Sequence, residues 1–136
     1  VFAADWIMIE SNDLLTGENA TYIVADADVA TGDYGYSVPV MGFGKTEDGV
    51  VIPVIILSRS ISNSVRFIRV MFDSVGVIEE YRIVDTGSGI AIADYTLFLE
   101  NMINSSRVAI EIPTYNGRKM QMIWSIGNFH SLIMRM

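Results

Sequence analysis

Alternation of large apolar residues with a period of two is the feature that most constrains the fold of this chain. It is clearest near the C-terminus, in two short runs that each place every second residue on one side: Val108, Ile110 and Ile112, then Met120, Met122 and Trp124. Between the runs, Asn116 and Gly117 favour a tight turn because both residue types tolerate positive φ. The sequence therefore predicts an antiparallel hairpin here.

The same rhythm, bounded by Gly, Asn and Asp, recurs along most of the chain and predicts further strands. Residues 64–72 are apolar on both faces, which predicts a central strand covered on both sides. The expected strands outside the hairpin are residues 5–10, 21–29, 38–45, 50–59, 64–72, 77–84 and a short stub at 90–93.

Two segments change to a helical period. Phe98 and Met102 share a face at i, i+4, with Asp94 as a candidate N-cap, and Asn128 can cap a terminal helix after Gly127. About eight strands with these helices predict a mainly-β fold, an antiparallel two-layer β-sandwich or flattened barrel. It has one internal helix at about 94–106, a short C-terminal helix at about 128–136, and a single domain over 1–136.

The formal charge is -7, from 16 acidic and 9 basic side chains. A field of this sign repels phosphate backbones, so nucleic acid is not an expected partner. No apolar run reaches the ~18 residues of a membrane-spanning helix, so the chain is not expected to be membrane-integral. The absence of cysteine excludes disulfides and thiolate sites, and a lone His130 supports neither zinc nor a Ser-His-acid triad. We therefore expect no cofactor and no metal.

The stretch IVDTGSG, residues 83–89, is typical of the way aspartic proteases present their catalytic aspartate. At this length such an enzyme would be a retropepsin-like homodimer, with Asp85, Thr86 and Gly87 from each chain and two carboxylates sharing a proton. The expected helix at 94–106 leaves no room for the flap that such enzymes need. A turn in which the Asp85 side chain bonds local backbone amides explains the same letters.

Loop aromatics give a second candidate site. Tyr34 and Tyr36, with Phe43 nearby, could form a sticky rim for a protein or a glycan. Asp26, Asp28 and Asp33 offer oxygen ligands but lack the spacing of a calcium loop, so a solvated strand edge is the preferred interpretation.

The N-terminus bears on location. Val1 and Ala3 satisfy the small-residue rule of a signal-peptidase site, with cleavage possible after Ala3. We therefore expect an exported protein, periplasmic or extracellular, whose signal peptide has been removed.

The order of features resembles a group of exported bacterial β-sandwich proteins that includes the type VI secretion-associated accessory family. The paired cysteines common in that family are absent here, and the resemblance implies an envelope-facing, non-catalytic accessory or binding role, with a phage relative as another source. The matching stretches are Trp6 with Ser11-Asn-Asp-Leu-Leu-Thr16-Gly, Ile52-Pro-Val-Ile-Ile-Leu-Ser-Arg59, Tyr81-Arg-Ile-Val-Asp85 and Trp124-Ser-Ile-Gly127.

The sequence thus favours a non-enzymatic, exported protein that acts through contacts with a protein partner it does not identify. Two alternatives stay open. One is the homodimeric aspartic protease that uses Asp85. The other is a structural subunit of an assembly, which an exposed apolar edge strand at residues 50–57 would favour.

Overall fold

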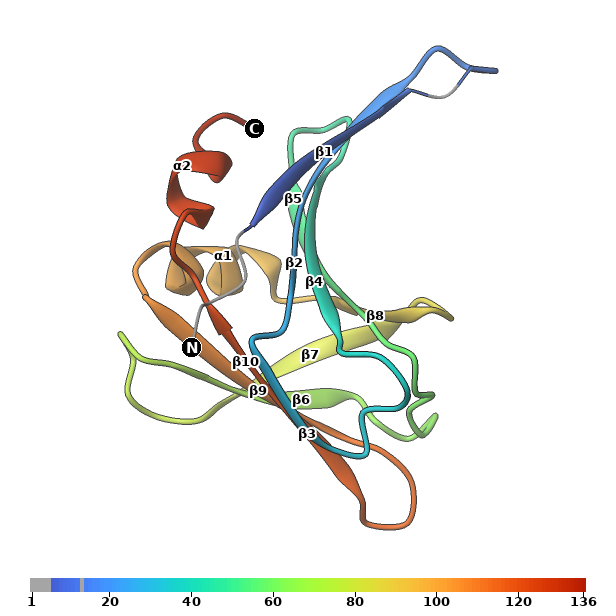
Figure 1. Cartoon of the computed structure of the whole chain (residues 1–136), viewed down its shortest axis with the longest axis vertical. Helices are drawn as coiled ribbons and strands as arrows, with labels where there is room; N and C mark the ends of the chain where they lie inside the picture. The colour runs from blue at the N-terminus through green and yellow to red at the C-terminus, as the bar shows by residue number, and fades with distance from the viewer. Residues whose placement is uncertain (1–5, 13) are drawn as a thin grey trace.

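The computed structural model describes residues 6–12 and 14–136, and Figure 1 shows their arrangement. Every strand pairing is antiparallel, in the order β1-β2-β4-β5-β8-β7-β6-β9-β10-β3, which confirms the predicted mainly-β fold. The strands are β1 (Ile7–Asn12), β2 (Asn19–Asp26), β3 (Val29–Gly32), β4 (Val40–Lys45), β5 (Val51–Ile56), β6 (Phe67–Phe72), β7 (Glu79–Asp85), β8 (Gly89–Ile92), β9 (Arg107–Pro113) and β10 (Lys119–Ser125).

The sheet curls until its two ends meet at Ala27 and Asp28. The backbone N–H of Ala27 donates to the carbonyl of Pro39, beside β4, at 2.9 Å, whereas the N–H of Asp28 donates to the carbonyl of Ile123 on β10 at 2.8 Å. Two consecutive residues therefore bond beside β4 and on β10, which stand far apart in the strand order, so the sheet closes into a flattened barrel. The expected strand 21–29 is consequently divided into β2 and β3. β1 pairs only with β2 among the described strands and lies outside the closed part.

An aromatic cluster fills the barrel beneath the helices. Phe43 lies at its centre, fully buried, with its ring centroid 4.7 Å from that of Phe129 and 5.8 Å from that of Trp6. Asn128 fixes the edge of the cluster because its amide accepts from the N–H of Trp6 at 2.9 Å and donates to the carbonyl of Trp6 at 3.0 Å. In β6, β9 and β10 every second residue is buried, as the period-two pattern requires.

The helices lie where the sequence predicts but are shorter. α1 is Tyr95–Ile103 and buries Phe98 and Met102, and α2 is Phe129–Ile133. Asp94 occupies the N-cap position of α1 without capping it, because its carboxylate accepts instead from the N–H of Arg82 at 2.8 Å. Neither helix of the described ranges is long and apolar enough to cross a membrane.

One expectation about strand environment is wrong, and the condition that would favour an assembly subunit is not met. β6, within residues 64–72, is covered on its inner face only, since Phe67 and Met71 on its outer face are 49% and 41% exposed. β5 pairs with β4 on one side and β8 on the other, so it is an interior strand of the sheet and not the exposed edge strand that would favour an assembly subunit. The export prediction rests on Val1 and Ala3, which lie outside the described residues.

Candidate functional site

The IVDTGSG motif forms the tight connection between β7 and β8. Oδ1 of Asp85 accepts a hydrogen bond from the N–H of Gly87 at 2.8 Å, and the N–H of Thr86 donates to the carbonyl of Gly89 at 3.0 Å. This confirms the turn interpretation of Asp85. Asp85 is exposed, and its carboxylate already stabilises the turn that contains Gly87, whose φ is +89°.

The turn borders a polar pocket of about 210 Å³ at one end of the barrel, which Arg59, Asn63 and Tyr115 also line. Asp85 is the only carboxylate among its lining residues. An aspartic protease needs a second carboxylate to share the proton, and the described residues that line this pocket could obtain one only from a second chain.

Arg59, the basic side chain that lines this pocket, forms an ion pair with Asp33. Nε of Arg59 lies 3.2 Å from a carboxylate oxygen of Asp33, and the guanidinium carbon lies 5.6 Å from the ring centroid of Tyr115. The Thr114 hydroxyl donates to the same carboxylate at 2.9 Å and, with Arg59, holds the pKa of Asp33 below its ordinary value. The pair Arg59–Asp33 is therefore neutral overall, and the described lining of the pocket presents no unpaired positive charge to an anionic ligand.

The predicted aromatic rim is only partly present. Tyr36 is 90% exposed and Tyr34 is half-buried in the loop between β3 and β4. The inclusion of Phe43 is wrong, because its register position opposite Ile23 and Pro53 turns the ring into the core.

The carboxylates of the Asp26–Asp33 segment do not converge. Oδ2 of Asp28 accepts from the N–H of Ser125 at 2.7 Å, Asp33 pairs with Arg59, and Asp26 is exposed. Across residues 6–12 and 14–136 no group of three His, Asp or Glu side chains is placed to hold a metal ion.

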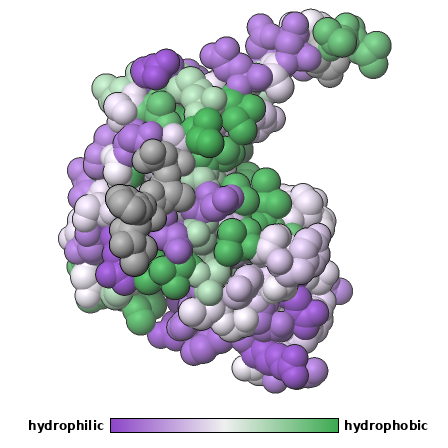
Figure 2. Space-filling model, viewed as in Figure 1, coloured by the Kyte–Doolittle hydropathy of each residue, from purple (hydrophilic) through white to green (hydrophobic). Residues whose placement is uncertain are grey.

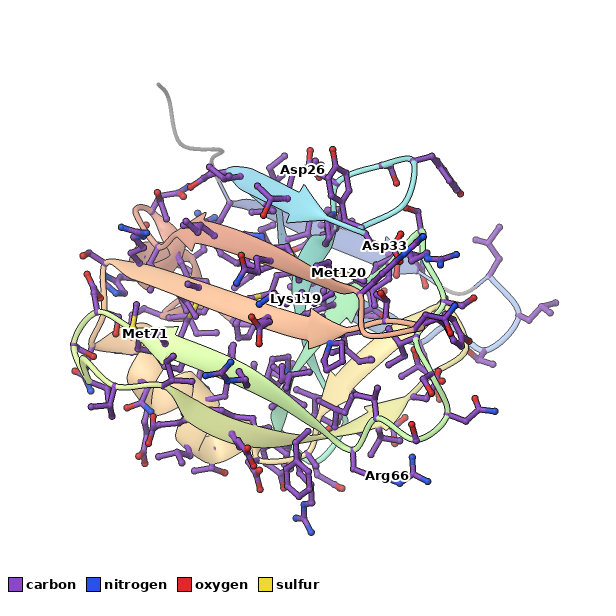
Figure 3. The ribbon with its side chains drawn as sticks, turned by 90° about the horizontal axis from the view of Figure 1, so that it is seen from below. Asp26, Asp33, Arg66, Met71, Lys119 and Met120 are labelled. Carbon is purple, nitrogen blue, oxygen red and sulfur yellow. The ribbon has the colours of Figure 1, made fainter. Side chains whose placement is uncertain are left out.

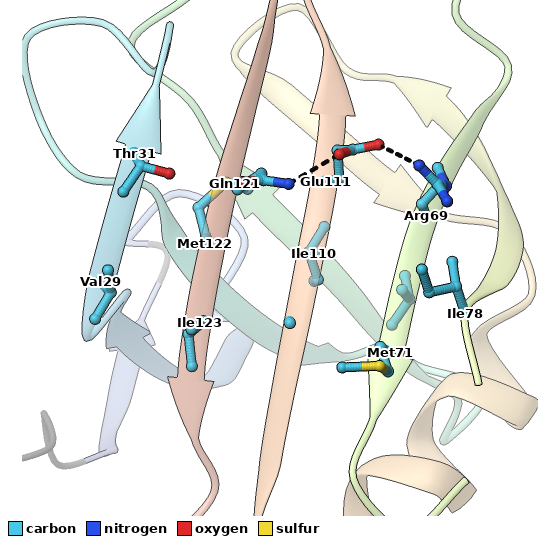
Figure 4. Close-up of a pocket in the computed structure, with 12 residues that line it drawn as sticks. Val29, Thr31, Arg69, Met71, Ile78, Ile110, Glu111, Gln121, Met122 and Ile123 are labelled. Carbon is cyan, nitrogen blue, oxygen red and sulfur yellow. Dashed lines mark hydrogen bonds and ion pairs between the residues drawn. The ribbon is translucent and has the colours of Figure 1, made fainter. Parts of the chain in front are cut away.

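A groove of about 290 Å³ crosses the outer surface of β3, β10, β9 and β6, which lie side by side in Figure 3. Figure 4 shows its apolar floor and, above it, the hydrogen-bonded row formed by Gln121, Glu111 and Arg69. Burial alone raises the pKa of Glu111, but hydrogen bonds from Lys119, Gln121 and Arg69 outweigh it and lower the pKa. The charges around this groove are thus paired within the chain.

The outer surface of the other half of the barrel is more extensive and carries no charge at its centre. Six strands contribute one row of register partners: Ile7, Val24, Gly42, Val54, Ala91 and Val84. A second row follows beside it: Ile9, Tyr22, Gly44 and Ile52. We call these two rows, together with Ile56, the apolar face.

The apolar face is open to solvent. Its ends, Ile7 and Val84, are 60% and 57% exposed, and Ile56 is 49% exposed. The ring of Tyr22 lies over Gly44, where an added Cβ would come within 3.0 Å of the ring. In Figure 2 the outline of the molecule is hollowed between the projecting β1–β2 hairpin and the rest of the chain, and hydrophobic residues line part of the hollow.

The hairpin beside the apolar face has an unusual charge. The first 44 residues contain seven acidic side chains and no lysine or arginine, whereas the remaining residues contain nine of each sign. The whole net charge of -7 therefore belongs to the first third of the chain. Glu10 is exposed on β1, Glu18 at the hairpin tip and Asp26 at the end of β2. The tip also exposes Leu14 and Leu15, at 93% and 98%.

Neither the apolar face nor the acidic first third of the chain was predicted, although the sequence contains an indication of each. The apolar run from Val50 to Leu57, interrupted only by Pro53, allows a strand with apolar residues on both faces, and the missing basic residues can be counted directly. Comparison of the chain with models of known protein families gives no match, and comparisons with curated proteins and with solved structures give none.

Proposed function

We propose that this protein is a non-catalytic binding protein that holds a protein partner on the apolar face. The observation that carries the proposal is the row from Ile7 to Val84, in which six neighbouring strands present aliphatic residues or glycine and no charge. Large contiguous apolar patches are rare on monomeric proteins and mark interaction sites. Burying such residues stabilises a complex by about 25 cal/mol per Å² of apolar surface, before the costs of association.

The partner we propose carries an apolar patch bordered by basic side chains. Glu10, Glu18 and Asp26 lie on the hairpin beside the apolar face, and no lysine or arginine occurs before Lys45. Complementary charge would raise the rate of encounter and exclude acidic competitors.

We further propose that the protein acts as an exported accessory protein of the bacterial envelope. Support comes from the resemblance carried by Trp6, Tyr81-Arg-Ile-Val-Asp85 and Trp124-Ser-Ile-Gly127, and from the small residues Val1 and Ala3. A particle surface of a phage is the other setting that the same resemblance allows.

A pair of matched variants tests the binding function. Val84→Asp places a charge on the apolar face, whereas Val77→Asp places the same charge in the loop between β6 and β7, where Val77 is 59% exposed. Proteins retained from an envelope extract would be identified, purified and titrated against wild type and both variants. We expect Val84→Asp to weaken binding at least tenfold and Val77→Asp to leave it within about twofold, because only the first leaves a charge desolvated in the interface.

Circular dichroism would verify that both variants remain folded. Equal binding by wild type and both variants would refute the assignment of the apolar face. If only Val77→Asp lost binding, the partner would contact the loop between β6 and β7 and not the apolar face.

A further inference from the structure

β1 is an edge strand, and only one of its two edges is paired with another described strand. It pairs with β2 over six consecutive residues, from Ile7 opposite Val24 to Asn12 opposite Asn19, and no other described strand lies against its second edge. In an antiparallel pair, alternate residues turn their N–H and C=O groups away from the partner strand. The second edge of β1 therefore presents a row of backbone donors and acceptors.

The usual protections of such an edge are missing from β1. Its sequence, IMIESN, has no proline and no lysine, and its register with β2 runs without a bulge. β3, at the opposite end of the strand order, has only four residues and is tied to β2 through Ala27 and Asp28. A long, regular, unprotected edge is the kind to which a further strand adds.

The two faces of β1 differ in chemistry. Ile7 and Ile9 belong to the apolar face, while Glu10 and Asn12 point to the opposite side together with Met8. A strand added to β1 would continue both faces, because paired strands share their inward and outward alternation. Its residues on one side would pack beside isoleucine, and those on the other would lie beside Glu10.

We propose that the partner binds by adding one extended segment to β1, apolar at every second position and basic at the positions between. This inference rests on the proposed binding function and specifies the form of the partner. The hydrogen bonds of the added strand would supply affinity, and the two faces would select the sequence.

Charge argues against two other occupants. A second copy of this chain would bring two hairpins together that have seven acidic residues and no basic residue in each first third, so like charges would face each other across the new pair. An anionic lipid surface would be repelled by the same residues, although Leu14 and Leu15 are exposed at the tip.

The test uses a synthetic eight-residue peptide that alternates valine and lysine, titrated into the full chain while amide exchange is followed by NMR. We expect protection to rise at least tenfold at every second amide of residues 7–12, since only alternate amides face the added strand. N-methylation of one alternate set of peptide amides should weaken binding at least tenfold, and N-methylation of the other set should leave it within about twofold. A valine and glutamate peptide should bind at least tenfold more weakly at low salt.

Two protein variants complete the design. Glu10→Lys should reverse the preference between the lysine and glutamate peptides, whereas Val77→Asp, in the exposed loop between β6 and β7, should bind the lysine peptide as wild type does. No protection in β1, protection at consecutive amides, or equal loss from both N-methylated peptides would overturn strand addition. So would a wild-type dimer whose formation protects β1 without peptide. If Val84→Asp weakens binding of the purified envelope partner but the peptide does not bind, strand addition is refuted and the proposed binding function stands. If the peptide binds at β1 but Val84→Asp does not change binding of the partner, the apolar face is refuted as the binding site and strand addition stands.

Discussion

The two glycines of IVDTGSG should respond differently to the same methyl group. A Cβ on Gly89 would lie 2.1 Å from the carbonyl oxygen of Ile55 and 3.0 Å from its carbonyl carbon, whereas a Cβ on Gly87 meets nothing within 4 Å. Gly87 is constrained only by its φ of +89°. We therefore expect Gly89→Ala to force β5 and β8 apart where Ile56 pairs with Gly89, and Gly87→Ala to strain one residue of the turn.

The sizes follow from these contacts. Overpacking against backbone costs about 3 kcal/mol in the free energy of unfolding. A left-handed alanine costs about 1–2 kcal/mol, of which about 0.5 kcal/mol is recovered because the unfolded chain is more restricted. At about 4 °C per kcal/mol for a chain of this length, Tm should fall by about 12 °C in Gly89→Ala and by about 4 °C in Gly87→Ala.

Thermal unfolding followed by circular dichroism measures both values. Gly49→Ala is the matched control for Gly87→Ala, because Gly49 has a φ of +82° and open space at its Cβ. If Gly89→Ala were no less stable than Gly87→Ala, the close approach of β5 and β8 would not be the reason for the second glycine.

Two further predictions concern carboxylates. Asp85→Asn should leave Tm nearly unchanged, because an amide oxygen can still accept from the N–H of Gly87, and neither wild type nor variant should cleave a peptide library at about pH 5; cleavage that the substitution abolishes would establish the protease. A hydrogen bond from the Ser106 hydroxyl, with backbone N–H donors of Ser106 and Arg107, lowers the pKa of Asp73 from 3.8. The Asp73 carboxylate therefore stabilises the fold above that value, and this contribution is lost as the pH falls below it. The free energy of unfolding, measured with urea between about pH 5 and about pH 3, should thus vary less with pH in Asp73→Asn than in wild type. Equal variation in the two proteins would contradict the role of Asp73.

Local patterns predicted the parts of the fold that depend on local contacts. The hairpin around Asn116 and Gly117 is present, with φ of 56° and 74° at these residues and Trp124 opposite Val108. The break between β2 and β3 was not predicted, because alternation continues through Ala27 and Asp28 and only the distant Ile123 divides the strand. The internal helix was predicted for the same reason as the hairpin: Phe98 and Met102, four residues apart, indicate a helical face from the local sequence alone.

The candidate site was harder to predict because exposed and buried apolar residues look the same in a sequence. Ile52 and Val54 were interpreted as part of a strand, but nothing in their alternation says that they face solvent. Phe43 was taken for a rim residue because it is near Tyr34 and Tyr36 in the sequence, and its register alone turns it inward. Which face of a strand is covered depends on pairings made by residues far away in the chain.

The junction at Ala27 and Asp28 also sets the order in which the chain can fold. The pairing of β3 with β10 joins residues that are 88 to 94 positions apart, whereas β9 and β10 are neighbours in the chain. Closing so long a loop carries a larger entropic cost than closing a hairpin, and folds rich in such pairings form slowly. The pairing of β3 with β10 would then form last and close a barrel in which the strands that are neighbours in the chain have already paired.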